Sequence, residues 1–211
     1  MNMSVLLLPE ILESEWALSI EMIKDFKMSS YYLQLRHACS DLDISLLYKS
    51  ALHGLGHIER VLLLGSLIAW KEELSDLDTN LLLLACSYHD AGREHDYRDE
   101  KHGLRSAEMI HNWNLPAYST LPEKEQKILL AMVEAHSLND SLMLKVGTSR
   151  LIEGKSMPRY FELAADLKDA DNLDRVRLRD LDVSHLRHRS SINLAPFAES
   201  LYLKYLEAEQ I

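Results

Sequence analysis

Apolar residues that recur at steps of three and four are the feature that most constrains the fold of this chain. That spacing is the period of an α-helix, and it places such residues on one face. Only 7 glycines and 5 prolines interrupt the 211 residues, so few positions favour a break. No segment alternates convincingly as a strand would, although 141–152 could hold a short extended segment. We therefore expect an all-α fold, a single compact helical bundle over 1–211.

The periodic segments place helices along most of the chain. We expect them at about 10–27, 30–40, 55–74, 80–90, 103–114, 122–137, 159–180 and 196–208. Asp78 and Thr79 have the character of N-cap residues for the fourth helix, and Gly92 is expected to end it. The stretch 93–101 is polar and is expected to be a surface loop.

Charge and cysteine content narrow the functional class. The chain has 23 Lys and Arg against 33 Asp and Glu, a net charge of −10. Such a chain repels the phosphate backbone of nucleic acids, so no nucleic acid polymer is expected as a partner. Two cysteines are too few for a disulfide framework, and the apolar runs fall short of the ~20 residues of a membrane span. We therefore expect a cytoplasmic protein that does not associate with membranes.

Histidines are concentrated in one part of the sequence. Seven of the 10 lie between positions 53 and 136. His53 and His57 are four residues apart and share a helix face. His89 and Asp90 are adjacent at the end of a very apolar helix, where burial would be costly unless a charge neutralises them. A divalent cation would do so, because imidazole and carboxylate are both metal ligands. Further on, Asp171 lies three residues before Asp174.

The order of these segments resembles the HD superfamily of metal-dependent phosphohydrolases, which is named for the adjacent His-Asp pair. His57 begins a His-x-x-Arg-Val segment, His89-Asp90 continues as Ala-Gly-Arg, and Asp171 is followed three residues later by another aspartate. The resemblance covers about 55–180 and leaves 1–54 and 181–211 as flanking helices. Within the superfamily, the chain resembles a group of stand-alone bacterial HD proteins whose substrate is undefined.

The resemblance implies a set of metal ligands. The single-metal set would be His57, His89, Asp90 and Asp171. Members with two metals add two histidines, for which His102 and His136 are the candidates, with Asp90 as the natural bridge. We therefore expect one or two divalent ions, with Mn, Fe, Co, Ni, Zn and Mg left open. If His102 and His136 are not ligands, they would contact phosphate or lie behind the ligands of a single ion.

Candidate residues for catalysis and substrate binding surround these ligands. With Asp90, Arg93 and His53 are the candidate catalytic residues. The resemblance implies that Arg93 contacts phosphate, but a salt bridge to Glu94 or Asp96 is the alternative. His53 could face the cleft as a proton donor, or cap its helix.

Two further cations are candidates for substrate binding alongside Arg93. Lys168 lies about one helical turn before Asp171 and could face the cleft or water. Arg187 or Arg189, in the basic stretch 185–189, could bind an anionic substrate or belong to a solvated loop.

Four other polar residues have structural interpretations. Arg60 is expected to be a buried cation paired with a carboxylate, and Asp174 to orient a ligand or an arginine. His95 is expected to be solvated or at the substrate edge, and His111 to be structural.

The expected activity is hydrolysis of a phosphomonoester or phosphodiester in a nucleotide-like or other small phosphorylated substrate, with metal-activated water as the nucleophile. The Gly-Tyr-Pro signature of cyclic-di-GMP phosphodiesterases is absent, and Arg93 and Glu94 replace the Glu-Asp of alarmone hydrolases. Two alternatives remain: a catalytically silent binding or signalling module on the HD scaffold, and a di-iron oxygenase on that scaffold. The oligomeric state is left open.

Overall fold

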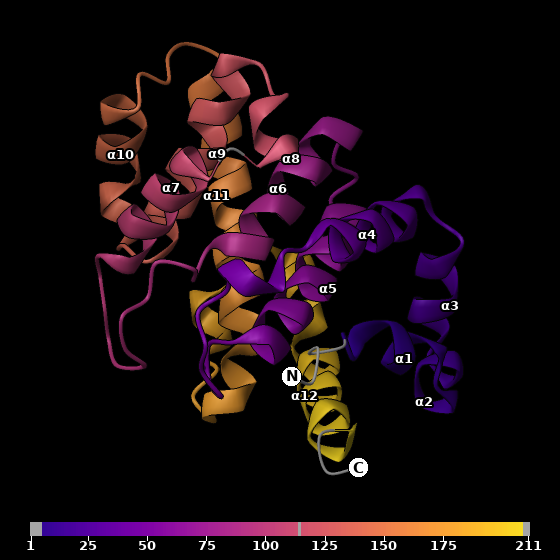
Figure 1. Ribbon diagram of the computed structural model, residues 1–211. Coiled ribbons are helices and arrows are strands. Elements are labelled where there is room, and N and C mark those ends of the chain that lie inside the picture. The colour runs from indigo at the N-terminus through magenta and orange to yellow at the C-terminus, as the bar shows by residue number, and fades with distance from the viewer. Residues whose placement is uncertain (1–5, 114, 209–211) are drawn as a thin grey trace.

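The most apolar helix of the chain forms the centre of a helical bundle (Figure 1). The computed structural model describes residues 6–113 and 115–208. In α5 (Leu55–Lys71), all residues of 57–69 are buried. A helix that is covered on every face is stable only inside a larger assembly of helices. The helices α6 (Asp76–Tyr88) and α11 (Ser156–Leu173) pack against α5, and α9 (Glu123–His136) packs against both of them.

Helices with fewer buried residues cover this centre. In Figure 1, the N-terminal helices lie on one side of it and α7 and α10 lie on the other. The helix α4 packs on α5 and α6, α7 packs on α9, and α12 packs on α5 and α11. The bounds are α4 (Ser30–Asp41), α7 (His102–Asn112), α8 (Pro116–Ser119), α10 (Met143–Ser149) and α12 (Arg189–Ala208), with 3-10 helices η1 (Ile44–Leu46), η2 (Asp140–Leu142), η3 (Asp174–Leu178) and η4 (Val183–His185).

The all-α prediction is confirmed, and the described residues contain no strand. The extended segment suggested at 141–152 is wrong, because η2 and α10 occupy most of it. Met143 and Val146 are three residues apart and both buried, which is the helical period. The single-domain organisation over 1–211 stays a prediction.

The helix expected at 10–27 is divided into three: α1 (Leu8–Glu13), α2 (Glu15–Ser19) and α3 (Glu21–Lys27). The breaks fall at Ser14 and Ile20, whose backbones are extended. The Ser14 hydroxyl donates to the carbonyl of Ile11 at 2.6 Å and accepts from the amide of Ala17 at 3.4 Å. It thereby satisfies groups at the end of one helix and the start of the next.

Both expected boundaries of the fourth helix are also wrong. Its N-cap is Ser75, whose hydroxyl accepts from the amide of Asp78 at 3.2 Å. Asp78 and Thr79 therefore lie inside the first turn. The helix ends at Tyr88, so that His89 and Asp90 lie in the turn that follows instead of on the helix before Gly92.

Other boundaries differ by a few residues. The helix α11 starts and ends earlier than 159–180, and η3 continues it. The helix α12 begins at Arg189 and contains Pro196. For α7, Asn114, the last residue of its expected range, lies outside the described residues. Across 6–113 and 115–208, no helix combines the length with the apolar content that crossing a membrane requires.

Candidate metal centre

Side chains from five segments meet at one buried point of the bundle. The structure brings together all of the residues that the sequence proposes as metal ligands: His57 on α5, His89 and Asp90 in the turn after α6, His102 at the start of α7, His136 at the end of α9, and Asp171 on α11. Five of them are buried as whole residues, and the side chain of Asp171 is 27% exposed. The centre therefore opens to solvent beside Asp171.

The carboxylate of Asp90 divides the histidines into two pairs. Its Oδ2 lies 3.4 Å from Nε2 of His57 and 3.9 Å from Nε2 of His89. Its Oδ1 lies 3.0 Å from Nε2 of His102 and 3.6 Å from Nε2 of His136. Oδ1 of Asp171 joins the first pair, at 3.5 Å from His57 and 3.8 Å from His89. The arrangement is two donor sets that share one bridging carboxylate.

Each of these four imidazoles is oriented through its other nitrogen. In every case Nδ1 faces an oxygen that can only accept a hydrogen bond, so Nδ1 carries the proton and Nε2 presents a lone pair to the centre. The acceptors are Oδ2 of Asp174 for His57 at 2.7 Å, the Cys86 carbonyl for His89 at 3.0 Å, the Asp99 carbonyl for His102, and the Val133 carbonyl for His136 at 2.6 Å.

These lone pairs give a direct test of whether a cation fits. Nε2 of His57 lies 3.2 Å from Nε2 of His89, and Nε2 of His102 lies 2.8 Å from Nε2 of His136. Two unprotonated nitrogens at that separation repel each other unless a metal ion or a proton lies within reach of both. Oδ1 of Asp90 is buried and accepts no hydrogen bond within the described residues, and such an atom requires a partner. The residues present therefore fit divalent metal ions.

Electrostatics support ligand character in the same groups. Burial opposes ionisation of Asp90, but His89 and the other histidines outweigh it and hold the pKa of this carboxyl well below its usual value. Asp171 behaves likewise, with His89 as its main counter-charge, and its pKa is also well below the usual value. Burial lowers the pKa of His136 to about 4. At neutral pH these groups are therefore two carboxylates and a neutral imidazole, the forms that bind metals.

His89 behaves differently from the other histidines in the absence of a cation. Burial acts to lower its pKa, but Asp90 and Asp171 together raise it above the usual value. The raised pKa means that His89 takes up a proton more readily than an ordinary histidine does. Because a ligand must lose its proton to bind a metal, a proton on His89 competes with a cation.

A buried ion pair supports the first donor set from behind. Nε and Nη2 of Arg60 bind the two carboxylate oxygens of Asp174 at 2.6 and 3.0 Å, and the same carboxylate holds His57. The guanidinium of Arg60 also lies 5.3 and 5.1 Å from the ring centroids of Tyr202 and Tyr205. These are the structural roles that the sequence suggests for Arg60 and Asp174.

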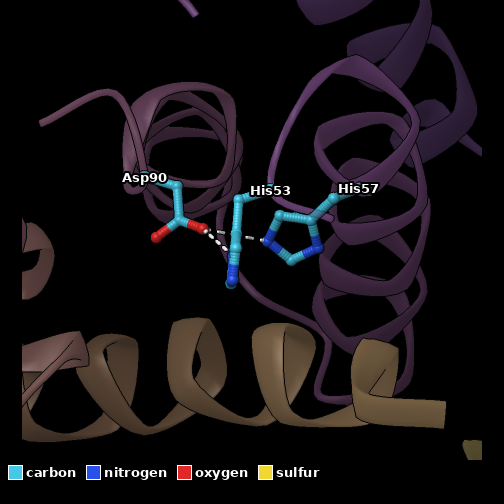
Figure 2. Close-up of side chains that lie close together, drawn as sticks. All are labelled: His53, His57 and Asp90. Carbon is cyan, nitrogen blue, oxygen red and sulfur yellow. Dashed lines mark hydrogen bonds and ion pairs between the residues drawn. The ribbon is translucent and has the colours of Figure 1, made fainter. Parts of the chain in front are cut away.

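The two other candidate catalytic residues both contact Asp90. Nδ1 of His53 lies 2.8 Å from Oδ2 of Asp90, and Figure 2 shows the rings of His53 and His57 beside this carboxylate. His53 therefore faces the centre, and no side chain caps α5 at Gly54. Nε of Arg93 lies 2.8 Å from Oδ2 of Asp90, so the carboxylate beside Arg93 is Asp90, not the Glu94 or Asp96 considered from sequence.

Lys168 and Arg187 lie close to the centre but are paired with a carboxylate. Both line a cavity of about 410 Å³, which His136 and Asp171 also line. Asp140 lies between the two cations and binds both. Sequence reasoning missed Asp140, and it also missed Arg177, whose Nη2 lies 3.3 Å from Nδ1 of His53. No local motif marks either residue, since each pairing depends on how distant segments meet.

The remaining histidines in the cluster lie outside the centre. Nδ1 of His111 lies 2.9 Å from the hydroxyl of Tyr118, which agrees with the expected structural role. His95 is exposed in the loop after α6, where its ring lies 6.0 Å from that of Tyr97. Asp96, next to it, accepts a hydrogen bond from Ser50 at 2.5 Å.

Comparisons with known proteins agree with this geometry. Searches of curated proteins and of solved structures give no match. The family model described as the HD domain matches residues 54–176, which is more than half of the chain and includes every candidate metal ligand. The resemblance noted in the sequence is therefore confirmed. On the strength of this match and of the buried His and Asp cluster, the chain belongs to the HD domain family.

Proposed function

We propose that this protein is a metal-dependent phosphohydrolase that acts on a phosphomonoester or phosphodiester of a small, nucleotide-like or other phosphorylated molecule. The observation that carries the proposal is the pairing of each oxygen of Asp90 with two imidazole Nε2 atoms. A divalent ion held in such a site would bind phosphate oxygens and would lower the pKa of a bound water toward neutrality. Membership of the HD domain family supports the same reaction class.

The two donor sets would hold the metal. His57, His89 and Asp171 with Oδ2 of Asp90 would hold one ion, and His102 and His136 with Oδ1 of Asp90 would hold a second. Because imidazole nitrogens predominate, the set favours Mn, Fe, Co, Ni or Zn over Mg, which prefers oxygen ligands. The two ions would share Asp90, so loss of this one residue is expected to empty both sites.

Arg93 and His53 supply the remaining chemistry. The side chain of Arg93 is 11% exposed and is held beside Asp90, where its guanidinium would bind phosphate oxygens and stabilise their charge in the transition state. His53 holds a ring nitrogen against the same carboxylate and is our candidate for delivering a proton to the leaving oxygen.

The setting of the reaction follows from charge and cysteine chemistry. Both cysteines are free and buried, which suits a reducing cytoplasm. The net charge of −10 disfavours a nucleic acid polymer as substrate. We therefore propose a small phosphorylated molecule of the cytoplasm as the partner.

Metal analysis and turnover test the proposal together. The purified protein is analysed for bound metals and then assayed on p-nitrophenyl phosphate and bis-p-nitrophenyl phosphate with Mn²⁺ or Ni²⁺. We expect metal-dependent hydrolysis that Asp90→Ala abolishes and that Asp25→Ala, at an exposed position of α3, does not change.

Other outcomes favour the alternatives. Folded protein without turnover under any metal contradicts the proposal and supports a silent binding module. Oxygen uptake by the iron-loaded protein, in place of phosphate release, supports a di-iron oxygenase.

A further inference from the structure

Two cations lie on the wall of the cavity that adjoins the metal centre. The cavity, of about 410 Å³, is lined by His136 and Asp171 of the centre and by Lys168 and Arg187. Lys168 and Asp171 are both on α11, three residues or about 4.5 Å apart along the helix axis. A molecule with a phosphate at the metal centre would therefore extend toward these cations.

Lys168 is a buried cation with few partners. Its side chain is 3% exposed, and Nζ donates to the carbonyl of Leu138 at 2.6 Å and to Oδ1 of Asp140 at 2.6 Å. A buried ammonium group requires a counter-charge. In the structure that counter-charge is Asp140.

Arg187 binds the same carboxylate from another direction. Its Nη2 donates to Oδ1 of Asp140 at 2.8 Å and its Nε donates to Oδ2 at 3.0 Å. This forked pattern is how arginine binds carboxylates and phosphates. Asp169 fixes Arg187 separately, since its carboxylate accepts from the backbone amide of Arg187 at 2.9 Å and from Nη1 at 3.1 Å. The guanidinium therefore keeps its position if Asp140 leaves.

Asp140 itself is held less firmly than the cations. Its side chain is 51% exposed, and it belongs to the short η2 (Asp140–Leu142) between α9 and α10. Burial opposes its ionisation, but hydrogen bonds from Arg187 and Lys168 outweigh burial and lower its pKa to about 2. A half-exposed carboxylate thus neutralises two better-buried cations at the edge of a cavity.

We propose that Lys168 and Arg187 form a seat for a second anionic group of the substrate, a phosphate or a carboxylate, and that Asp140 fills this seat until the substrate displaces it. The inference rests on the proposed function, because it assumes that a first phosphate is bound at the metal centre. It narrows the substrate class to small phosphorylated molecules that carry a second anion a few bonds from the scissile phosphate.

Anion binding to the metal-free protein tests the seat without any turnover. Inorganic phosphate and acetate are titrated calorimetrically into wild type, Asp140→Asn and Asp180→Asn after treatment with chelator. Asp180 is the matched control, because its side chain is 49% exposed and pairs with Arg175 away from the cavity. We expect Asp140→Asn to bind phosphate about tenfold more tightly than wild type, the size of one charge-assisted hydrogen bond, and Asp180→Asn to match wild type.

Lys168→Met keeps most of the length of the side chain and removes its charge. We expect the double variant Asp140→Asn/Lys168→Met to lose most of the phosphate affinity that Asp140→Asn alone gains. If burial of Lys168 makes this variant unfold, Asp140→Asn against Asp180→Asn still decides the matter. Equal phosphate affinity in those two variants overturns the proposal.

Substrate preference of the metal-loaded enzyme tests the second anion. The probes are propyl phosphate, 1,3-propanediol bisphosphate and 3-(phosphonooxy)propanoate. We expect kcat/KM for one of the two probes that carry a second anion to exceed that for propyl phosphate by about tenfold. The value for the bisphosphate is first divided by two, because its two phosphates are equivalent. In Asp140→Asn we expect this kcat/KM to rise further through a lower KM. The preferred probe identifies the second group as phosphate or carboxylate.

The two experiments separate the failure of this inference from failure of the proposed function. Turnover of all three probes at the same kcat/KM overturns the seat and leaves the hydrolase standing. No turnover of any probe, with tighter phosphate binding in Asp140→Asn, contradicts the hydrolase and leaves an anion seat in place.

Discussion

At the scale of the residue, the centre depends on hydrogen bonds made away from it. His57, His89, His102 and His136 all present Nε2 because Nδ1 of each faces an acceptor. Three of these acceptors are backbone carbonyls, which no side-chain substitution removes. The fourth is Asp174, so it is the position where a substitution can change the orientation of a ligand directly.

Asp174→Asn is expected to weaken metal binding by about 10–100-fold, the usual cost of losing a carboxylate behind a metal-bound histidine. The amide can turn its NH₂ group toward His57 and leave Nδ1 without a good acceptor. Competition with a chromophoric chelator measures the affinity. Asp25→Asn serves as the control, and equal affinity in the two variants would show that Asp174 does not orient His57.

His188 makes stability depend on pH at another site. A hydrogen bond with Asp169 raises the pKa of His188 from 6.5 to about 9. Burial acts to lower this pKa, and the nearby carboxylates of Asp166 and Glu162 help to raise it. Because the folded protein holds this proton more tightly than the unfolded chain, the stabilisation is fully present below pH 6.5 and is lost as the pH rises through 9. Burial raises the pKa of Asp166 to about 7. The contribution of Asp166 to stability is therefore also lost as the pH rises, but at a lower pH, near 7.

Urea unfolding at pH 6.5 and at pH 9.5 checks the His188 prediction. Between these pH values we expect the free energy of unfolding of wild type to fall by about 2 kcal/mol more than that of His188→Gln. This is roughly half of the free energy that corresponds to the full pKa shift of His188, because solvent screens part of the interaction. Equal losses in the two proteins would show that His188 does not carry the effect.

At the scale of the element, the candidate metal ligands lie mainly at helix ends. His102 begins α7, His136 ends α9, and His89 follows α6. Their positions therefore depend on how closely the helices approach one another. The helices α7 and α9 lie close together at Gly103, where an added Cβ would lie 2.7 Å from both the hydroxyl of Ser137 and the carbonyl of Val133.

Gly103→Ala is expected to push α7 away from α9 and to separate His102 from His136. We expect a loss of about 1–3 kcal/mol in the free energy of unfolding, together with a fall in bound metal as the second donor set opens. Leu104→Ala, at the next and 39% exposed position, is the control. Denaturant unfolding and elemental analysis measure the two effects, and unchanged metal content in Gly103→Ala would contradict the coupling.

At the scale of the whole molecule, one cluster joins helices that are far apart in the sequence. The candidate metal ligands, which lie between positions 57 and 171 in the sequence, meet around Asp90 in the interior of the bundle. An ion bound there would contact most of the central helices at once. Its binding free energy would then add to the stability of the fold.

Removal of metal is therefore expected to lower the melting temperature, and addition of Mn²⁺ or Ni²⁺ to restore it. At 100 times the dissociation constant, one bound ion adds about 2.7 kcal/mol. Differential scanning calorimetry with and without chelator measures the change. Asp90→Asn should melt at a temperature that no longer responds to metal, while Asp25→Asn should respond as wild type does.

The sequence by itself determined the fold class and the composition of the centre. Helical periodicity and few breakers are local properties, and the His57, His89-Asp90 and Asp171 segments are recognisable one at a time. Helix boundaries were less secure. Ser14 interrupts an apolar pattern that continues across it, because its hydroxyl satisfies the helix ends without altering the period.

Only the tertiary structure decided how the polar groups are paired. Asp140 lies 28 residues from Lys168 and 47 from Arg187 in the chain, and the carbonyls behind three of the histidines carry no sequence signal. These interactions act over a few ångströms and depend on the approach of separate helices. A pattern of residue types fixes which helix face is apolar, but it does not fix the distances between side chains on different helices.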